Sequence, residues 1–141
     1  LAAMAGFAAP PEPAPEPAAI TLGRAVYDRM KCVECHGTQG RGDGPSVPTL
    51  KDDWGRPIVP SDLTRTDRIR RPAALDVIAI LYTGLTGTPM PSYADALTPP
   101  EAWDLTRYLI SLRKPVSKWR RFLLDEPLSW EVPLHEAAPN Q

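Results

Sequence analysis

The chain has 141 residues, of which 43% are hydrophobic and 23% are charged, values that suit one globular domain. Its 18 prolines disfavour a large regular sheet, because proline has no backbone N–H to donate to a neighbouring strand. The 16 basic and 17 acidic residues nearly cancel, which argues against a nucleic-acid partner. Two cysteines are too few for a disulfide scaffold, and no apolar run is long enough to span a bilayer.

Residues 1–17 are expected to form a tail or linker outside the folded domain. Leu1–Ala9 is apolar and rich in alanine, and Pro10–Pro17 holds five prolines in eight residues, which favours an extended polyproline II spacer. Leu1–Ala9 fits three interpretations: a loose tail, the end of a signal peptide, or the stub of a removed anchor. Because so proline-rich a segment gains little from packing on its own domain, we expect Ala2–Pro17 to contact a partner protein.

Three helices are predicted after this tail. Apolar residues at helical spacing predict one helix over Thr21–Lys31 and a second over Pro72–Gly84. A third spans Thr98–Leu112, where Thr98–Glu101 combines a capping box with proline at the first helical position. Residues 37–66 are dense in glycine and proline, which predicts a long loop that is functional or wraps around another group. Without a convincing strand, the predicted fold class is all-α, with three or more helices and long loops.

The folded domain is expected over residues 18–113, followed by an extension over residues 114–141. The extension carries Trp119, Phe122 and Trp130 among charges and prolines. It is either a strap on the domain's own surface or a docking segment, and we expect it to contact a partner. Two basic clusters are either a solvated face or a docking surface. They comprise Arg65, Arg68, Arg70 and Arg71, and Arg113, Lys114, Lys118, Arg120 and Arg121.

Both cysteines lie in one motif, Cys32-Val33-Glu34-Cys35-His36, and C-x-x-C-H is the attachment signature of c-type haem. Two thiols three residues apart can each form a thioether with one vinyl group of the same porphyrin. His36, directly after the second thiol, is then held under the iron as an axial ligand. The haem would also supply the core that so small a helical domain lacks. We therefore predict one haem c, covalently bound through Cys32 and Cys35.

Three other interpretations of this motif are open. A C-x-x-C pair can be half of a zinc site, but the chain offers only His36 and the distant His135 as further nitrogen ligands, and no third cysteine. A thioredoxin-like dithiol belongs in a βαβ context, which the sequence lacks. A chance match without any cofactor is the third interpretation, and the position of a later methionine disfavours it.

An electron-carrying haem needs a second strong ligand, and a thioether raises the reduction potential. The chain has three methionines, Met4, Met30 and Met90. Met4 lies in the tail, and Met30 lies in the helix that leads into the haem motif. Met90 lies in the loop Gly87–Pro91, where flanking prolines stiffen the backbone. A loop methionine alone more often fills a gap in the core, but beside a C-x-x-C-H motif we expect Met90 to be the sixth ligand.

Together these motifs resemble class I mono-haem cytochromes c of the bacterial kind, over residues 21–112. The order of a C-x-x-C-H motif, a later Met-Pro and a closing helix carries the resemblance. The matching residues are Gly23, Tyr27, Cys32–Gly37, Gly40–Pro45, Pro60–Thr64, Tyr82–Gly84, Met90–Tyr93, Trp103, Tyr108 and Leu112. The resemblance implies the small cytochrome c fold, with helices and long loops wrapped around one covalent haem.

The family also implies roles for residues outside the main motifs. Its first and last helices cross, with a glycine receiving an aromatic side chain, and Gly23 and Tyr108 resemble that pair. A proline carbonyl accepts the Nδ1–H of the axial histidine, which fixes the ring and raises its basicity. Pro45 resembles that proline, with Pro48 as a substitute.

Haem propionates need hydrogen-bond donors, and the long loop offers three. Trp54, Arg56 and Arg41 are the expected donors, although arginines in loops are more often simply solvated. Tyr93, in the Met90–Tyr93 motif, joins the expected cofactor-binding residues by resemblance.

The resemblance implies one-electron transfer, in which no substrate bond is made or broken. Two strong ligands, His36 and Met90, leave no open position for oxygen chemistry. We expect the haem subunit or domain of a larger oxidoreductase or respiratory assembly, with redox proteins as partners. The alternatives are a freely diffusing electron shuttle and a haem enzyme in which Met90 is displaced. Because this family receives its haem outside the bacterial cytoplasm, we expect a periplasmic protein. Any association with a membrane would come through partner proteins or through a removed N-terminal segment.

Overall fold

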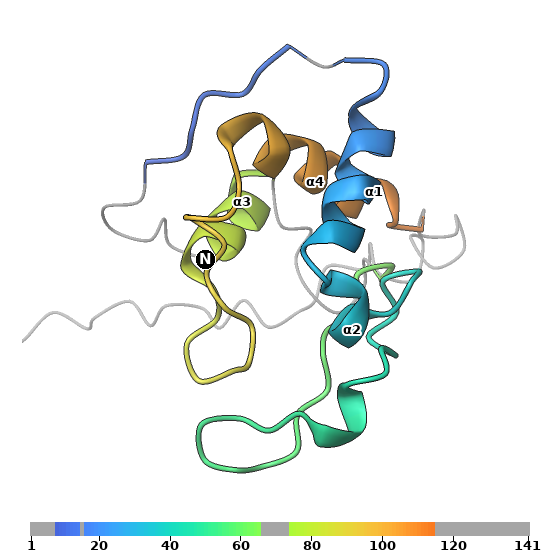
Figure 1. Ribbon diagram of the computed structural model, residues 1–141, viewed down its shortest axis with the longest axis vertical. Coiled ribbons are helices and arrows are strands. Elements are labelled where there is room, and N and C mark those ends of the chain that lie inside the picture. Colours follow the sequence, from blue (N-terminus) through green and yellow to red (C-terminus); the bar gives the residue numbers. More distant parts are fainter. Residues whose placement is uncertain (1–7, 15, 66–73, 115–141) are drawn as a thin grey trace, which may run out of the picture.

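The computed structural model describes residues 8–14, 16–65 and 74–114 (Figure 1). Within these ranges no strand forms, and a single isolated bridge joins Lys51 and Pro57. The helical elements are α1 (Ala19–Arg29), α2 (Cys32–His36), a 3-10 turn η1 (Val47–Thr49), α3 (Ala74–Thr83) and α4 (Pro99–Ser111). The predicted all-α class is therefore confirmed.

Helices α1 and α4 cross in close contact, with α3 beside α4 (Figure 1). Gly23 lies at the crossing, where a Cβ atom would overlap the carbonyl oxygen of Asp104 and come within 2.8 Å of the Cβ of Tyr108. The rings of Tyr27 and Tyr108 meet edge to face, with centroids 5.4 Å apart. The expected pairing of Gly23 with Tyr108 is therefore present, and it allows the two backbones to approach closely.

The buried core is small and lies between α1, α3 and α4. It consists of Val26, Tyr27, Val77, Leu81, Leu97, Ala102, Leu105 and Tyr108. A second set of apolar side chains packs against this core but remains half-exposed: Met30, Cys32, Val33, Leu63, Tyr82, Met90, Tyr93, Leu109 and Leu112. These side chains, which include Cys32 and Met90, surround the core without being fully buried by the described residues.

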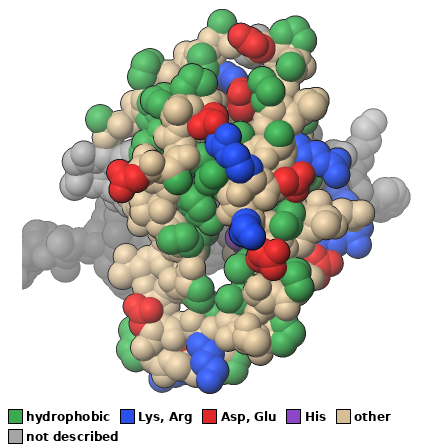
Figure 2. Space-filling view, viewed as in Figure 1, with side chains coloured by type: hydrophobic (Ala, Val, Ile, Leu, Met, Phe, Trp, Pro, Cys, Tyr) green, Lys and Arg blue, Asp and Glu red, His purple; other side chains and the backbone are tan. Residues whose placement is uncertain are grey.

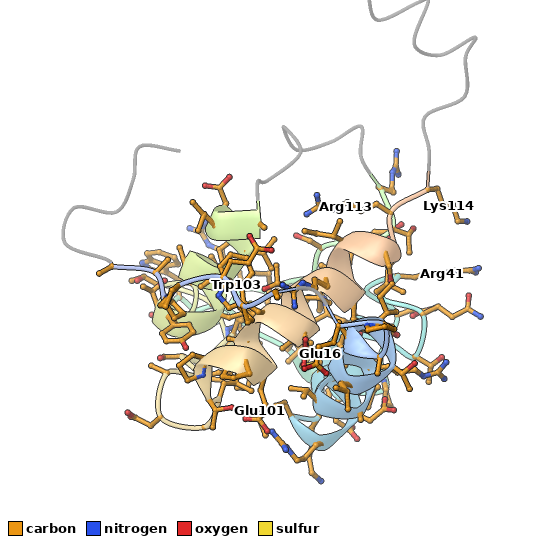
Figure 3. All side chains as sticks on the ribbon, turned by 90° about the horizontal axis from the view of Figure 1, so that it is seen from above. Glu16, Arg41, Glu101, Trp103, Arg113 and Lys114 are labelled. Carbon is orange, nitrogen blue, oxygen red and sulfur yellow. The ribbon has the colours of Figure 1, made fainter. Side chains whose placement is uncertain are left out.

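The start of α4 has the predicted capping box. Thr98 and Glu101 exchange both hydrogen bonds of the box, and Glu101 also pairs with Arg29 of α1 at 2.7 Å (Figure 3). The backbone N–H of Thr98, followed by the Arg29 guanidinium and the Thr98 hydroxyl, lowers the pKa of Glu101 from 4.5 to about 2. The capping box therefore also links α4 to α1.

The end of α3 agrees with the prediction, whereas α2 was not predicted as a helix. Thr83 is the last residue of α3, and Gly84 follows with φ +67°. Helix α2 has five residues and begins after Lys31, which adopts a left-handed φ of 57°. Five residues are too few to show a helical period, which explains why sequence patterns did not reveal α2.

Residues 8–14 form an extended segment, here called the strap, that crosses α4 near Trp103 (Figure 3). The Trp103 indole N–H donates to the carbonyl of Pro10 at 3.2 Å. The Arg107 guanidinium donates to the carbonyl of Pro13 at 2.8 Å and to the Glu12 carboxylate at 3.2 Å. The same guanidinium lies 6.0 Å from the centre of the Trp103 ring.

The strap lies on the chain's own α4, contrary to the expectation that so proline-rich a segment gains little from packing on its own domain. The physical reason is that Pro10 and Pro13 offer carbonyl acceptors, and α4 presents two side-chain donors, on Trp103 and Arg107, to meet them. Contact of Ala2–Pro17 with a partner stays a prediction. Residues 1–7 lie outside the described part of the chain. So do residues 115–141, with the predicted docking aromatics Trp119, Phe122 and Trp130. None of the described helices has the length and apolar character that crossing a membrane requires.

Candidate functional site

Helix α2 presents the two cysteines of the motif. Positions i and i+3 share one face of a helix, so the thiols of Cys32 and Cys35 project in similar directions. Both are free thiols and both are half-buried. Burial raises the pKa of the Cys32 thiol to about 11, so this side chain is a neutral thiol at neutral pH. The helix thus offers a matched pair of thiols beside half-exposed apolar surface.

His36 ends α2 with one ring nitrogen held by the backbone. Its Nδ1 lies 3.3 Å from the carbonyl oxygen of Ser61. A carbonyl can only accept, so Nδ1 carries the proton and the Nε2 lone pair is left for a metal. Burial lowers the pKa of His36, and the contact with Ser61 opposes this shift in part. The side chain is therefore set as a neutral imidazole, the form that ligates iron.

The partner of His36 is a correction to the prediction, because Ser61 holds the ring where Pro45 was expected. Pro45 lies exposed in the glycine-rich loop, and Pro48 is exposed too. The residues on either side of Pro45 bind the backbone of α2 instead: the Gly44 N–H donates to the carbonyl of Cys35 at 3.1 Å. The loop next to Pro45 is thus occupied with α2, and a later segment reaches the histidine ring.

Two glycines bring that later segment to the motif. The Leu63 N–H donates to the carbonyl of Gly40 at 2.7 Å. Gly42 adopts φ +75°, and a Cβ atom there would overlap the carbonyl oxygen of Pro60. The turn at Asp62 is held locally, because its carboxylate accepts from both the N–H and the hydroxyl of Thr64. Sequence reasoning noted both segments but had no local signal that they meet.

Met90 lies in a loop that its own hydrogen bonds hold in place. The Leu85 N–H donates to the carbonyl of Met90 at 3.1 Å, and the Met90 N–H donates to the hydroxyl of Thr88 at 3.3 Å. The Tyr93 N–H donates to the carbonyl of Leu81 at 2.8 Å. The Met90 side chain is half-buried and packs against the core that Cys32 also contacts.

Tyr93 links this loop to α2. Burial raises the pKa of the Tyr93 hydroxyl, and ionised thiols at Cys32 and Cys35 would raise it further because both lie nearby. Tyr93, Met90 and Cys32 all pack against the same core. The structure therefore brings the end of the Met90 loop and the cysteine pair into one region.

The expected propionate donors lie on exposed turns. The carboxylate of Asp52 accepts from the backbone N–H groups of Trp54 and Arg56, which shapes the turn between them. Trp54 is 74% exposed, and its ring lies 3.3 Å from the position a Cβ of Gly87 would occupy. Arg41, also exposed, projects away from the helices (Figure 3). Their role toward propionates stays a prediction.

The turn that carries Trp54 therefore approaches the Met90 loop. The Asp53 N–H donates to the carbonyl of Gly87 at 3.2 Å, which joins the two loops. Figure 2 shows this face hollowed between the helices and the loop of residues 47–60, with hydrophobic side chains around the hollow. The motif, the two loops and the core thus frame one apolar recess.

The chemistry of these groups matches an apolar, covalently held iron porphyrin. Two thiols, one imidazole with a free nitrogen and one thioether are the groups that attach and ligate haem c. Zinc fits less well, since no three His, Cys, Asp or Glu side chains come together as metal ligands within residues 8–14, 16–65 and 74–114.

A family model described as Cytochrome c matches residues 20–113. The chain belongs to the cytochrome c family. Haem c, held covalently, is the cofactor of this family, and Cys32 and Cys35 have the spacing that its attachment requires. The resemblance inferred from the motifs is confirmed at the level of the family.

This cytochrome c is similar to an oxidase subunit and to a chain of a protein complex, each longer than the matched region. The chain is 30% identical over 103 residues to the Cbb3-type cytochrome c oxidase subunit FixP of Sinorhizobium medicae, covering 71% of this chain and 32% of the subunit. It is 40% identical, with a TM-score of 0.66, to a chain of the Kuenenia stuttgartiensis reducing HAO-like protein complex, covering 74% of this chain and 52% of that one. The chain thus spans about a third and about half of these relatives.

Proposed function

We propose that this chain transfers single electrons through one haem c, attached at Cys32 and Cys35 and ligated by His36 and Met90. The observation that carries the proposal is the contact between His36 Nδ1 and the Ser61 carbonyl, which leaves Nε2 as a preset iron ligand. Met90 supplies the second donor from a loop held by its own hydrogen bonds beside the same core. Haem iron supplies the one-electron couple.

Each of these side chains has a distinct task. The Cys32 and Cys35 sulfurs would hold the haem covalently through thioethers. The Ser61 carbonyl orients the His36 ring and increases its basicity, which favours the ferric state. The Met90 thioether favours the ferrous state and so raises the reduction potential.

We propose further that the chain works as the haem subunit or domain of a larger assembly in the periplasm. The relatives named above support this, because one is an oxidase subunit and the other belongs to a protein complex. The partners would then be other redox proteins that pass electrons to or from this haem. A freely diffusing shuttle is the competing form of the same function.

A pair of methionine variants tests the ligand assignment. Met90→Leu conserves volume and should abolish the weak near-infrared sulfur–iron absorption of the ferric protein, lower the reduction potential and admit carbon monoxide to the ferrous iron. Met30→Leu is the matched control, because Met30 is also half-buried against the core. It should leave all three properties unchanged.

Two outcomes would contradict the proposal. Retention of the near-infrared absorption in Met90→Leu would show that another residue ligates the iron. Rapid, tight binding of carbon monoxide by the unaltered ferrous protein would instead favour a haem enzyme with a displaceable ligand. Co-purification with the native assembly separates the subunit from the free shuttle, since a shuttle would purify alone.

A further inference from the structure

Gly84 lies where the end of α3 meets the Met90 loop. It adopts φ +67°, and a Cβ atom there would lie 2.7 Å from the carbonyl oxygen of Met90 and 2.8 Å from backbone atoms of Pro91 and Ser92. Real Cβ atoms do not approach other atoms this closely. The obstructing atoms belong to the backbone and cannot rotate away, so any side chain at position 84 must push the loop outward.

The same loop is fastened to the last turn of α3. Carbonyls in the last turn of a helix lack partners within the helix. Here the Tyr82 carbonyl accepts from the Ser92 hydroxyl at 2.5 Å, and the Leu81 carbonyl accepts from the Tyr93 N–H at 2.8 Å. The Ser92 hydroxyl also accepts from the Ala94 N–H at 3.2 Å. The backbone immediately after Met90 is thus held directly against α3.

We infer that Gly84 is a positioning residue for Met90. Because position 84 has no side chain, the loop can lie close against the end of α3, and this close approach places the Met90 thioether within reach of the iron. The inference rests on the proposed function, in which Met90 is the sixth ligand. Ser92 assists from the next turn of the loop, because its hydroxyl bridges the loop to the Tyr82 carbonyl.

The chain contains a matched control for this effect. Gly55 has φ +77°, close to that of Gly84, but no atom lies within 4 Å of the position of its Cβ. Gly55→Ala therefore carries the backbone strain of a left-handed alanine without the collision. A difference between Gly84→Ala and Gly55→Ala reports the collision with the Met90 loop alone.

The experiment compares the haem-loaded proteins at neutral pH. Gly84→Ala should weaken the near-infrared sulfur–iron absorption and lower the potential. It should also speed carbon monoxide binding by roughly tenfold, because the iron–Met90 bond is expected to become less stable by about 1.4 kcal/mol. Gly55→Ala, which strains its own turn without this collision, should keep the near-infrared sulfur–iron absorption. Ser92→Ala should shift the same properties in the same direction by less, and Ser92→Thr, which retains a hydroxyl, should restore them.

The remaining outcomes distinguish failure of the positioning role from failure of the ligand assignment. If Gly84→Ala keeps the absorption, potential and binding rate while Met90→Leu loses the absorption, the positioning role is wrong and the ligand assignment stands. If Met90→Leu keeps the absorption, the ligand assignment fails and the inference fails with it. If Gly84→Ala does not yield folded protein, Ser92→Ala decides, and unchanged properties in that variant overturn the inference.

Discussion

The contact between His36 and Ser61 predicts that Gly42→Ala raises the reduction potential. A Cβ atom at position 42 would overlap the Pro60 carbonyl oxygen, so the segment that carries Ser61 must move. Moving it lengthens the 3.3 Å distance between the Ser61 oxygen and the Nδ1 of His36. The imidazole then loses basicity and stabilises ferric iron less.

The size of this effect follows from the hydrogen bond that is lost. A neutral hydrogen bond contributes about 0.5–1.5 kcal/mol net to a folded protein. If the whole contribution is lost from the ferric state, the potential rises by about 20–60 mV, since a tenfold change is about 1.4 kcal/mol and 59 mV for one electron. Gly55→Ala shares the left-handed backbone without the collision, so it controls for backbone strain alone and should not reproduce this rise.

A voltammetric titration of the haem-loaded variants measures the potentials directly. The reasoning would be refuted if Gly42→Ala gave the potential of Gly55→Ala, or a lower one. Gly84→Ala should shift the potential in the opposite direction, because it disturbs the ligand that favours ferrous iron. Opposite signs from two alanine substitutions at glycines of similar φ would exclude a general loosening of the fold as the cause.

Two further predictions concern the links between the helices. Glu101 stays ionised to a lower pH in the folded chain than in the unfolded one, so its stabilising contribution is complete above about pH 4.5 and is lost as the pH falls toward 2. Glu101→Gln should therefore lower the free energy of unfolding, measured with denaturant, by about 1 kcal/mol at pH 7. Near pH 2 the variant and the unaltered protein should be equally stable, and equal destabilisation at both pH values would contradict this. Arg107→Gln should cost about 1–3 kcal/mol by releasing the strap of residues 8–14 while leaving the haem spectrum unchanged. The exposed Arg24→Gln is its control, and equal stability of the two variants would show that the strap contributes nothing.

Local signals in the sequence predicted the local parts of the structure. The capping box at Thr98–Glu101 and the glycine after α3 each depend on a few neighbouring residues, and both are confirmed. The C-x-x-C-H motif is also local, and together with the later Met-Pro and the closing helix it indicated the family.

Contacts between distant residues could not be read in the same way. Ser61 lies 25 residues from His36, and Pro10 lies 93 residues from Trp103. Such contacts depend on where two separate glycines or two side-chain donors come to lie in the fold. The Pro45 assignment went wrong for this reason, because the family pattern supplied a proline without showing which segment reaches the ring. Met90 as the sixth ligand stays a prediction.

The proposed function combines one covalent haem with two axial ligands from distant parts of the chain. Helix α2 provides the thiols and the imidazole, and the loop after α3 provides the thioether. Two close backbone contacts, at Gly42 and Gly84, connect these ligands to the rest of the fold. The potential of the haem should therefore respond to substitutions that touch neither the iron nor its ligands.

Near-infrared magnetic circular dichroism of the ferric, haem-loaded chain at neutral pH tests the ligand pair most directly. The account predicts a low-spin spectrum with the sulfur-to-iron charge-transfer band of His36 and Met90 ligation. A spectrum of two nitrogen ligands, or a high-spin spectrum with water at the sixth position, would contradict it.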